Sequence, residues 1–407
     1  MSTQLPRFGT RRLKYLASLN MGQSPSSDDY VADPKEGVPF LQGTAEFTDF
    51  NPIPRIFCRT PTKMASRGDI LFSVRAPVGQ LNIANTDVGI GRGLCAVTPS
   101  EALDTSYTWW ALHESRHLLN RVATGSTYDA VAVDDVGNLL ITFPPLPRQQ
   151  GIAAYLDRET AKIDAMIAAK ERLLALLAEK RRALITHAVT RGLNPDAHME
   201  DSGVEWLGEI PEHWSVERLA YQFNERDERN HPDLPLLEVS LRHGVILREF
   251  SSDKIEGTAA DFNTYKVARR GHIVFNKMRM WQGAVGIAPE DGLVSPDYVV
   301  AEPIGQVSPE YAGLLFRTPA FSAECGRRSH GLVWDRLRLY WEGFKNIRVG
   351  IPPADEQAEI AKQLQQASHR FDAFESHASR SIELLKERRS ALIAAAVTGQ
   401  VDVEEAA

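Results

Sequence analysis

Two stretches of the chain carry apolar residues at seven-residue intervals. The series are Leu156, Ile163, Lys170, Leu177 and Leu184 in the first stretch, with one polar member, and Leu364, Phe371, Ala378, Leu385 and Leu392 in the second. Intermediate apolar positions widen both series: Ile167, Leu173, Leu174 and Ala188, and then Ile360, Phe374 and Ile382. A sustained seven-residue apolar repeat forms the seam of a coiled coil. Each stretch is therefore predicted to be a long helix that packs against a partner.

The two stretches repeat each other. The segment Pro144 to Thr190 matches the segment Pro352 to Thr398 without a gap, at an offset of 208 residues. The matches include Gln149 with Gln357, and each copy follows a Pro-Pro pair, which favours extended backbone just before a helix. Both copies are rich in Ala, Leu, Glu, Lys, Arg and Gln, the good helix formers. A helix of this length would measure roughly 60 Å, and its obvious partner is the other copy.

The regions before the two helices also correspond, although more loosely. Arg67 to Phe72 matches Arg270 to Phe275, and β-rich runs are expected at 69–74, 271–275 and 297–301. The predicted fold class is α+β: two globular mixed α/β domains joined by two long antiparallel coiled-coil helices, with an internal pseudo-two-fold repeat. The predicted boundaries are 1–146 and 193–353 for the globular domains, 147–192 and 354–398 for the helices, and 399–407 for a tail.

Composition adds little to this picture, but it limits the alternatives. Hydrophobic residues make up 43% of the chain and charged residues 24%, as in ordinary globular proteins. The three cysteines are far apart, and the N-terminal stretch lacks the apolar core of a signal peptide, so we expect a reducing cytoplasm. The net charge of −7 counts against nucleic-acid binding, although a local basic face is enough for phosphate contact.

Some longer phrases resemble a known family, the specificity subunits of type I restriction–modification systems. The phrase from Asp201 to Trp214 resembles the family's entry into its second recognition domain, and 38–43 and 124–129 resemble stretches of its first. Residues 155–160 and 182–190 resemble its central conserved helix. The resemblance covers nearly the whole chain.

The resemblance implies a non-catalytic subunit that serves phage defence. The globular domains would be target-recognition domains that each read half of a bipartite double-stranded DNA site. The helices would set the spacer and dock two methyltransferase subunits, and restriction subunits would join through that core. S-adenosylmethionine, ATP and Mg would bind to those partners, with no cofactor or metal in this chain. The sequence has no GxxxxGK[ST] loop, no Asn/Asp-Pro-Pro-Tyr methylation motif and no nuclease pattern.

Candidate DNA contacts follow from residue chemistry. Short polar residues in glycine-containing loops can approach a groove or a phosphate, and arginine and lysine bind guanine or phosphate. In the first domain the candidates are Ser73, Arg75, Ser126, Thr127 and Tyr128. In the second they are Lys277, Arg279, Arg327, Arg328, Trp334 and Arg336. For each residue an ordinary surface or core role is the alternative. Lys180, Arg181 and Arg182 could meet a methyltransferase, the DNA spacer or only solvent.

Two further interpretations of the chain stay open, a zinc metallopeptidase and a scaffold that binds only protein. His113, Glu114 and His117 form a literal HExxH, the pattern of a zinc metallopeptidase, but the sequence offers no third ligand nearby. The alternative for this stretch is an amphipathic helix that buries Trp110 and Leu118. Gly89 to Gly93 is a poor dinucleotide-binding loop and fits a glycine-rich turn of a β-domain. The remaining possibility is a coiled-coil scaffold that binds only protein.

Overall fold

The structure, a computed structural model, describes residues 8–123, 130–248, 261–331, 337–401 and 403 of the 407-residue chain, without the side chains of residues 117 and 120–123. The chain divides into a first unit, Met1–Glu171 with Ser379–Ala407, and a second unit, Arg172–Ala378. Helix α3 (Leu146–Arg191) begins in the first unit and ends in the second, and α7 (Ala354–Val397) does the reverse. Both begin and end within one residue of the predicted helices. No helix in the described ranges is long and apolar enough to cross a membrane.

The first unit is built on a four-stranded antiparallel sheet in the order β2–β10–β7–β8. Its strands are β2 (Ala17–Met21), β10 (Leu94–Pro99), β7 (Ile70–Ser73) and β8 (Leu81–Ile83). A small sheet pairs β1 (Thr10–Arg12) with β11 (Leu140–Thr142). A mixed sheet has the order β3 (Tyr30–Val31), β5 (Ile56–Cys58), β4 (Val38–Leu41), β9 (Val88–Ile90) and β6 (Met64–Ala65). The helices are α1 (Thr105–Ala123) and α2 (Val133–Gly137).

The second unit repeats the four-stranded sheet and the small two-stranded sheet of the first, and has separate strand pairs in place of the mixed sheet. Its four-stranded sheet has the order β15 (Phe223–Arg226), β22 (Tyr298–Pro303), β19 (Ile273–Asn276) and β20 (Val285–Ile287). A small sheet pairs β14 (Ser215–Arg218) with β23 (Arg348–Ile351). The other pairs are β12 (Met199–Asp201) with β13 (Glu209–Pro211), β16 (Leu237–Ser240) with β17 (Gly244–Leu247), and β18 (Lys266–Ala268) with β21 (Gly292–Val294). The helices are α4 (Pro309–Leu315), α5 (Pro319–Arg327) and α6 (Trp341–Lys345).

A buried glutamine fixes the start of each long helix to its globular domain. In the first unit, Gln149 accepts a hydrogen bond from the Asp104 amide at 2.7 Å and donates to the Pro144 carbonyl at 2.9 Å. In the second unit, Gln357 accepts from the Ser308 amide at 2.8 Å and donates to the Pro352 carbonyl at 2.8 Å. Because both glutamines are almost fully buried, these bonds satisfy groups that have no access to water.

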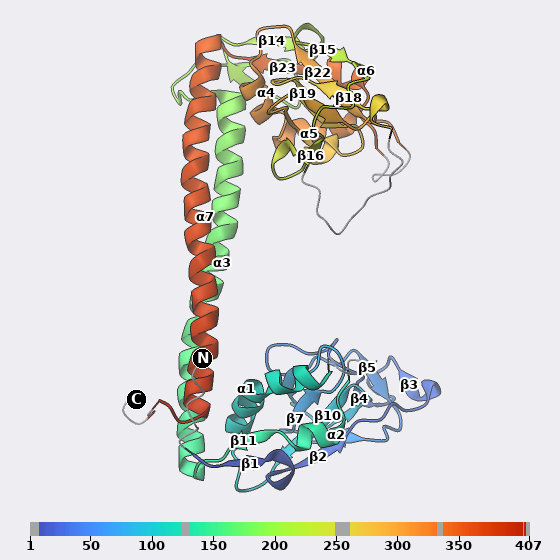
Figure 1. The fold of residues 1–407 in the computed structure, drawn as a ribbon, viewed down its shortest axis with the longest axis vertical. Helices are drawn as coiled ribbons and strands as arrows, with labels where there is room; N and C mark the ends of the chain where they lie inside the picture. Colours follow the sequence, from blue (N-terminus) through green and yellow to red (C-terminus); the bar gives the residue numbers. More distant parts are fainter. Residues whose placement is uncertain (1–7, 124–129, 249–260, 332–336, 402, 404–407) are drawn as a thin grey trace. The chain divides into compact units, whose positions relative to one another are not determined.

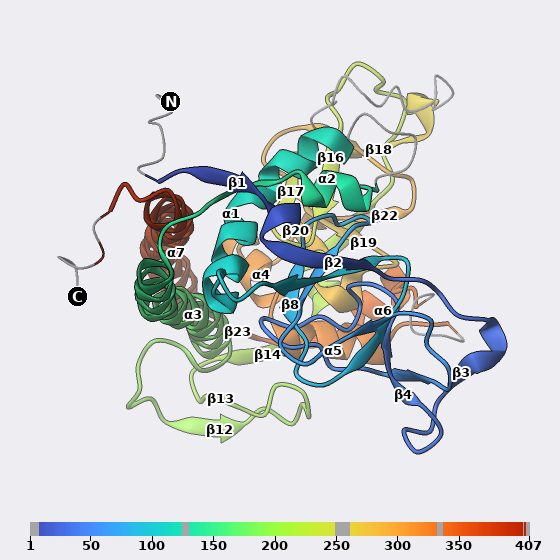
Figure 2. The ribbon, with the colours of Figure 1, turned by 90° about the horizontal axis from the view of Figure 1, so that it is seen from below.

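A buried tyrosine joins the globular domain to the end of the other long helix. The Tyr107 hydroxyl of α1 lies 2.7 Å from the Thr142 carbonyl and 3.5 Å from that of Val397 in α7. In the second unit, the Tyr311 hydroxyl of α4 lies 2.8 Å from the Val189 carbonyl in α3 and 3.2 Å from that of Gly350. In Figure 2, α1 lies beside both α3 and α7. Each domain is therefore held by both long helices.

Within each unit the α3 and α7 segments lie side by side and antiparallel (Figure 1). In the first unit, Arg389 of α7 bonds Asp164 of α3 at 2.9 Å, and further along α3 Glu171 lies 3.9 Å from Lys386. In the second unit the roles exchange, because Arg181 of α3 bonds Asp372 of α7 at 2.7 Å. This exchange between matched positions is the signature of an internal pseudo-two-fold repeat.

The predicted apolar seam is buried only in part. Leu156, Ile163 and Leu364 are at most 3% exposed, and Leu177 and Leu385 are half-buried. Leu173, Leu184 and Phe374 are 47%, 39% and 61% exposed, which corrects the expectation that they line the seam. The reason is geometric: two helices bury one contact line, and a wider apolar stripe leaves its flank uncovered.

Candidate nucleic-acid interface

The loop between β7 and β8 exposes Arg75, and Ser73 is the last residue of β7 before this loop. Ser73 is fully buried, and its hydroxyl donates to the Pro77 carbonyl and accepts from the Gln80 amide, both at 2.7 Å. Its assignment as a DNA contact was wrong, because a buried hydroxyl with both partners inside the loop cannot reach a nucleic acid. Arg75 is exposed, and its backbone bridges to Ala130. Arg75 therefore remains a candidate.

The matching loop of the second unit, between β19 and β20, presents Lys277 and Arg279. The Asn276 side chain accepts from the Met278 amide at 2.9 Å, and the Asn276 carbonyl accepts from the Arg279 amide at 3.0 Å. Met280 is fully buried, and the Trp281 indole donates to the Met278 carbonyl at 3.0 Å. The bulky residues of this run anchor the loop, and Arg279 is left exposed.

A group of cations surrounds this loop. Lys266 is almost fully buried 3.9 Å from Asp227, and burial lowers its pKa, with Lys277 adding to the effect. The hydrogen bond from Arg229, and then the charges of Lys266 and Lys277, hold the pKa of Asp227 below its ordinary value. Two cations, Arg229 and Lys266, thus pair with this carboxylate, and the charge of Lys277 acts on it as well. Sequence reasoning missed Arg229 and Lys266.

Arg327 and Arg328 are engaged within the fold. Both bond the carboxylate of Glu324, whose side chain is 1% exposed, and Arg327 also bonds Glu205 at 3.0 Å. Burial would raise the pKa of Glu324, but the hydrogen bonds from the two arginines outweigh it and lower that pKa. Their charge compensates a buried carboxylate, but the Arg327 side chain is 59% exposed, and DNA contact by these two residues stays a prediction.

The glycine-rich turn after β9 brings a further arginine to the surface of the first unit. A side chain at Gly91 would place its Cβ 2.5 Å from the Gln42 Oε1, so a larger residue would displace the Gln42 side chain. Gln42 donates to Ser24 at 2.8 Å and accepts from the Tyr30 hydroxyl at 3.1 Å, and exposed Arg92 also donates to Ser24 at 3.1 Å. Sequence analysis treated Gly89 to Gly93 as a turn and overlooked Arg92. An arginine between two glycines was the available signal.

Five predicted contacts cannot be located. They lie outside the described residues: Ser126, Thr127, Tyr128, Trp334 and Arg336.

The HExxH stretch lies on α1, as the amphipathic-helix reading expected. Trp110 is 2% exposed, but Leu118 is 40% exposed, so its predicted burial was wrong. The His113 ring lies 5.7 Å from the Trp109 ring and 6.0 Å from the Trp110 ring. The His117 side chain lies outside the described residues. Among the side chains that the structure does describe, no three histidine, cysteine or acidic groups could hold a metal together.

The environment of His113 predicts acid sensitivity of the first unit. Burial, then the charges of Arg116 and Arg389, lower its pKa to about 4. The unfolded chain has the higher pKa, about 6.5, so it binds the proton first, and stability falls as the pH drops below that value. We expect the first unit to melt at a lower temperature at about pH 5 than at about pH 7, and His113→Gln to reduce this difference. Calorimetry that shows the same difference in both proteins would contradict this role.

The comparison with known families gives one match. Residues 7–175 match the family described as type I restriction modification DNA specificity domain. The match covers the globular part of the first unit and the first part of α3.

Two curated relatives extend the comparison. The chain is 39% identical over 137 residues to the putative type I restriction enzyme MjaX specificity subunit of Methanocaldococcus jannaschii, a match that covers 33% of this chain and 32% of the relative. It is 21% identical over 311 residues to the type I restriction enzyme EcoKI specificity subunit of Escherichia coli K12, covering 71% of this chain and 63% of the relative. The chain thus spans about a third of the first relative and less than two thirds of the second.

A solved structure supports the fold over the full length. It comes from a study of complex assembly and conformational transition in the type I R-M system. The match has a TM-score of 0.66 at 17% identity and covers 98% of this chain and 100% of the other. The likeness confirms the predicted architecture of two α/β domains and two long helices.

Proposed function

We propose that the chain is a DNA specificity protein of the type I restriction–modification family, and that each of its units reads one half of a bipartite DNA site. The observation that carries the proposal is the duplication. Both units have the same four-stranded sheet order and the same glutamine and tyrosine contacts to the long helices. Matched readers on a two-fold protein suit DNA, where half-site spacing follows protein geometry.

We further propose that the helices dock two methyltransferase subunits, which restriction subunits then join. Leu173, Leu176 and Leu184 lie on one face of α3 by helical spacing, and each is at least 39% exposed. An uncovered apolar helix face fits a partner helix. In this proposal the chain is a cytoplasmic, non-catalytic subunit, and the sites for S-adenosylmethionine, ATP and Mg belong to the partners.

The salt dependence of DNA binding tests the proposal against a protein-only scaffold. A DNA reader that neutralises phosphates loses affinity linearly as the logarithm of the salt concentration rises. We expect the DNA affinity of the chain assembled with a methyltransferase subunit to fall more steeply with salt than the DNA affinity of the methyltransferase alone. A complex whose DNA affinity does not change when this chain is added would contradict the proposal.

Arg279 is the candidate for a specific contact in the second unit. We expect Arg279→Ala to weaken binding to the cognate site by about 1–3 kcal/mol if the guanidinium reads a base. Arg270, exposed just before β19, gives a matched control, because it stands at the opposite end of the strand from Arg279. Gel-shift titrations should separate the two variants. Equal affinity of Arg279→Ala and the unaltered chain would remove Arg279 from the interface.

A further inference from the structure

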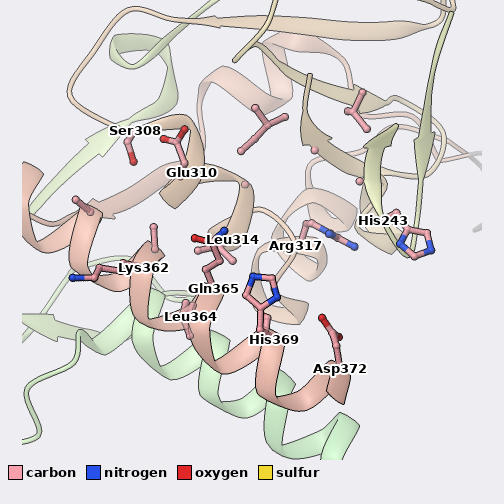
Figure 3. A pocket seen from close by; sticks show the side chains of 18 of the residues that line it. His243, Ser308, Glu310, Leu314, Arg317, Lys362, Leu364, Gln365, His369 and Asp372 are labelled. Carbon is pink, nitrogen blue, oxygen red and sulfur yellow. The ribbon is translucent and has the colours of Figure 1, made fainter. Parts of the chain in front are cut away.

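The second unit contains a cavity between the β16–β17 and β19–β20 hairpins, α4 and the first half of α7 (Figure 3). Its volume is about 780 Å³, and an adjoining hollow of about 560 Å³ shares Leu314, Arg317 and Asp372 with it. Pockets of this size that are mostly apolar, with a few convergent polar groups, are typical of small-molecule sites.

Small residues make the room at one end of the cavity. The wall includes Gly286, Gly313, Ala354, Ala358 and Ala361 with apolar Val245, Ile287 and Leu364, and its polar members include Ser308, Glu310, Lys362 and Gln365. The first unit differs at the matched place. Since Tyr107 and Tyr311 are counterparts, Gly313 and Leu314 stand where the first unit has Trp109 and Trp110, two nearly buried indoles. The second unit therefore has small or aliphatic residues where the first unit has two indoles, although the matched cavities are similar in volume, about 780 Å³ and about 730 Å³.

The other end of the cavity is basic. Arg317 donates to the carbonyls of Leu241 and Arg242 at 3.0 Å and 2.7 Å, which fixes the orientation of its guanidinium. The adjoining hollow is lined by four arginines and two carboxylates: Arg181, Arg182, Arg242, Arg317, Asp372 and Glu375. Figure 3 shows Arg317, His243 and His369 at the first cavity, with Asp372 nearby.

The matched cavity of the first unit has the opposite balance. It is lined by two arginines and three carboxylates: Arg116, Arg389, Asp49, Asp157 and Asp164. The surplus of positive charge is thus a feature of the second unit and not of the shared fold. Arg181 is paired with Asp372, so the positive surplus comes from Arg182, Arg242 and Arg317. Such a group of guanidiniums beside an apolar chamber is suited to an anion with an apolar body.

We propose that this cavity binds a small organic phosphate. The apolar or aromatic body lies in the chamber formed by Gly286, Gly313 and Ala361. The phosphate lies at the basic end and accepts hydrogen bonds from Arg317 and a neighbouring arginine. This site is separate from the DNA-reading loops and does not depend on the proposed function.

Calorimetric titration of the full chain, or of its complex, with phenyl phosphate and with inorganic phosphate tests the site. We expect phenyl phosphate to bind about tenfold or more tightly than inorganic phosphate, because its ring buries apolar surface. Arg317→Gln, which keeps a donor for the two carbonyls, should weaken phenyl phosphate about tenfold or more. Ala361→Leu should fill the chamber and weaken phenyl phosphate while leaving inorganic phosphate unchanged.

Arg116→Gln is the matched control, because it alters the counterpart cavity of the first unit, and it should leave binding unchanged. Circular dichroism spectra and melting temperatures like those of the unaltered chain establish that each variant is folded. The proposal is overturned if phenyl phosphate gives no heat at about 1 mM, where even a weak site would be partly filled. Equal affinity for the two phosphates, or no effect of Arg317→Gln, would also overturn it.

Discussion

Replacing Ile360 by alanine is expected to destabilise the second unit by about 2–5 kcal/mol. Ile360 lies in the first half of α7, is fully buried, and belongs to the same hydrophobic cluster as Ala188 and Val189 of α3 and Phe316, which follows α4. Its side chain therefore contributes buried apolar surface both to the core of the globular domain and to the contact between the two long helices. Truncation leaves a cavity that the surrounding residues can fill only in part.

Phe374 provides the comparison on the same helix. Its side chain is larger, but it is 61% exposed, so Phe374→Ala should change stability by no more than about 0.5 kcal/mol. Hydrogen–deuterium exchange of the β15–β22–β19–β20 sheet measures both effects within the second unit. Protection should fall strongly in the Ile360 variant and stay unchanged in the Phe374 variant. Similar losses in both would show that α7 does not form part of this core.

The repeat predicted the long helices closely because two independent copies carry the same pattern. The match of Gln149 with Gln357 marked positions that turn out to be equivalent, but the sequence did not reveal their role. That role depends on a turn which brings the Pro144 and Pro352 carbonyls back onto the amide groups. Such a contact is set by backbone geometry and not by a spacing rule.

The candidate DNA contacts were harder to predict, because a side chain must be exposed to reach DNA and the sequence does not show which side chains are exposed. Ser73 has the right chemistry, but it sits at the end of a strand that is buried throughout. The engagement of Arg327 and Arg328 could have been predicted, since Glu324 precedes them by three and four positions on a helix. Lys266 and Arg229 come near Lys277 only through strand pairing and loop packing, and the sequence gives no sign of it.

The exposed leucines of α3 show a limit of the heptad pattern. Leu184 belongs to the seven-residue series, yet it is 39% exposed. A sequence pattern marks apolar positions and does not say how many helices will cover them. The uncovered face suggests a place for a further helix, which is why we assign it to a partner subunit.

On the proposed function, lengthening both long helices is expected to change the gap in the recognised DNA site without changing its two halves. Seven residues inserted into α3 near Glu171, and seven into α7 near Ser379, would preserve the seven-residue apolar period. They would lengthen the helix pair by about 10 Å, which corresponds to up to about 3 base pairs of B-form DNA. The loops that we propose as base contacts would be unaltered, because they lie in the globular parts.

The control is a variant with fourteen residues inserted into one of the two helices and none into the other. The antiparallel partner helix then has no matching length. Such a chain should lose site-specific binding and not acquire a new gap.

The most direct measurement of the central claim is a genome-wide map of methylated bases in cells that express the chain with its methyltransferase partner and no other methyltransferase. The account predicts a motif of two fixed half-sites separated by an unspecified gap, and a longer gap with the same half-sites when both helices are lengthened. An undivided motif, or a gap that stays constant in the lengthened protein, would contradict it.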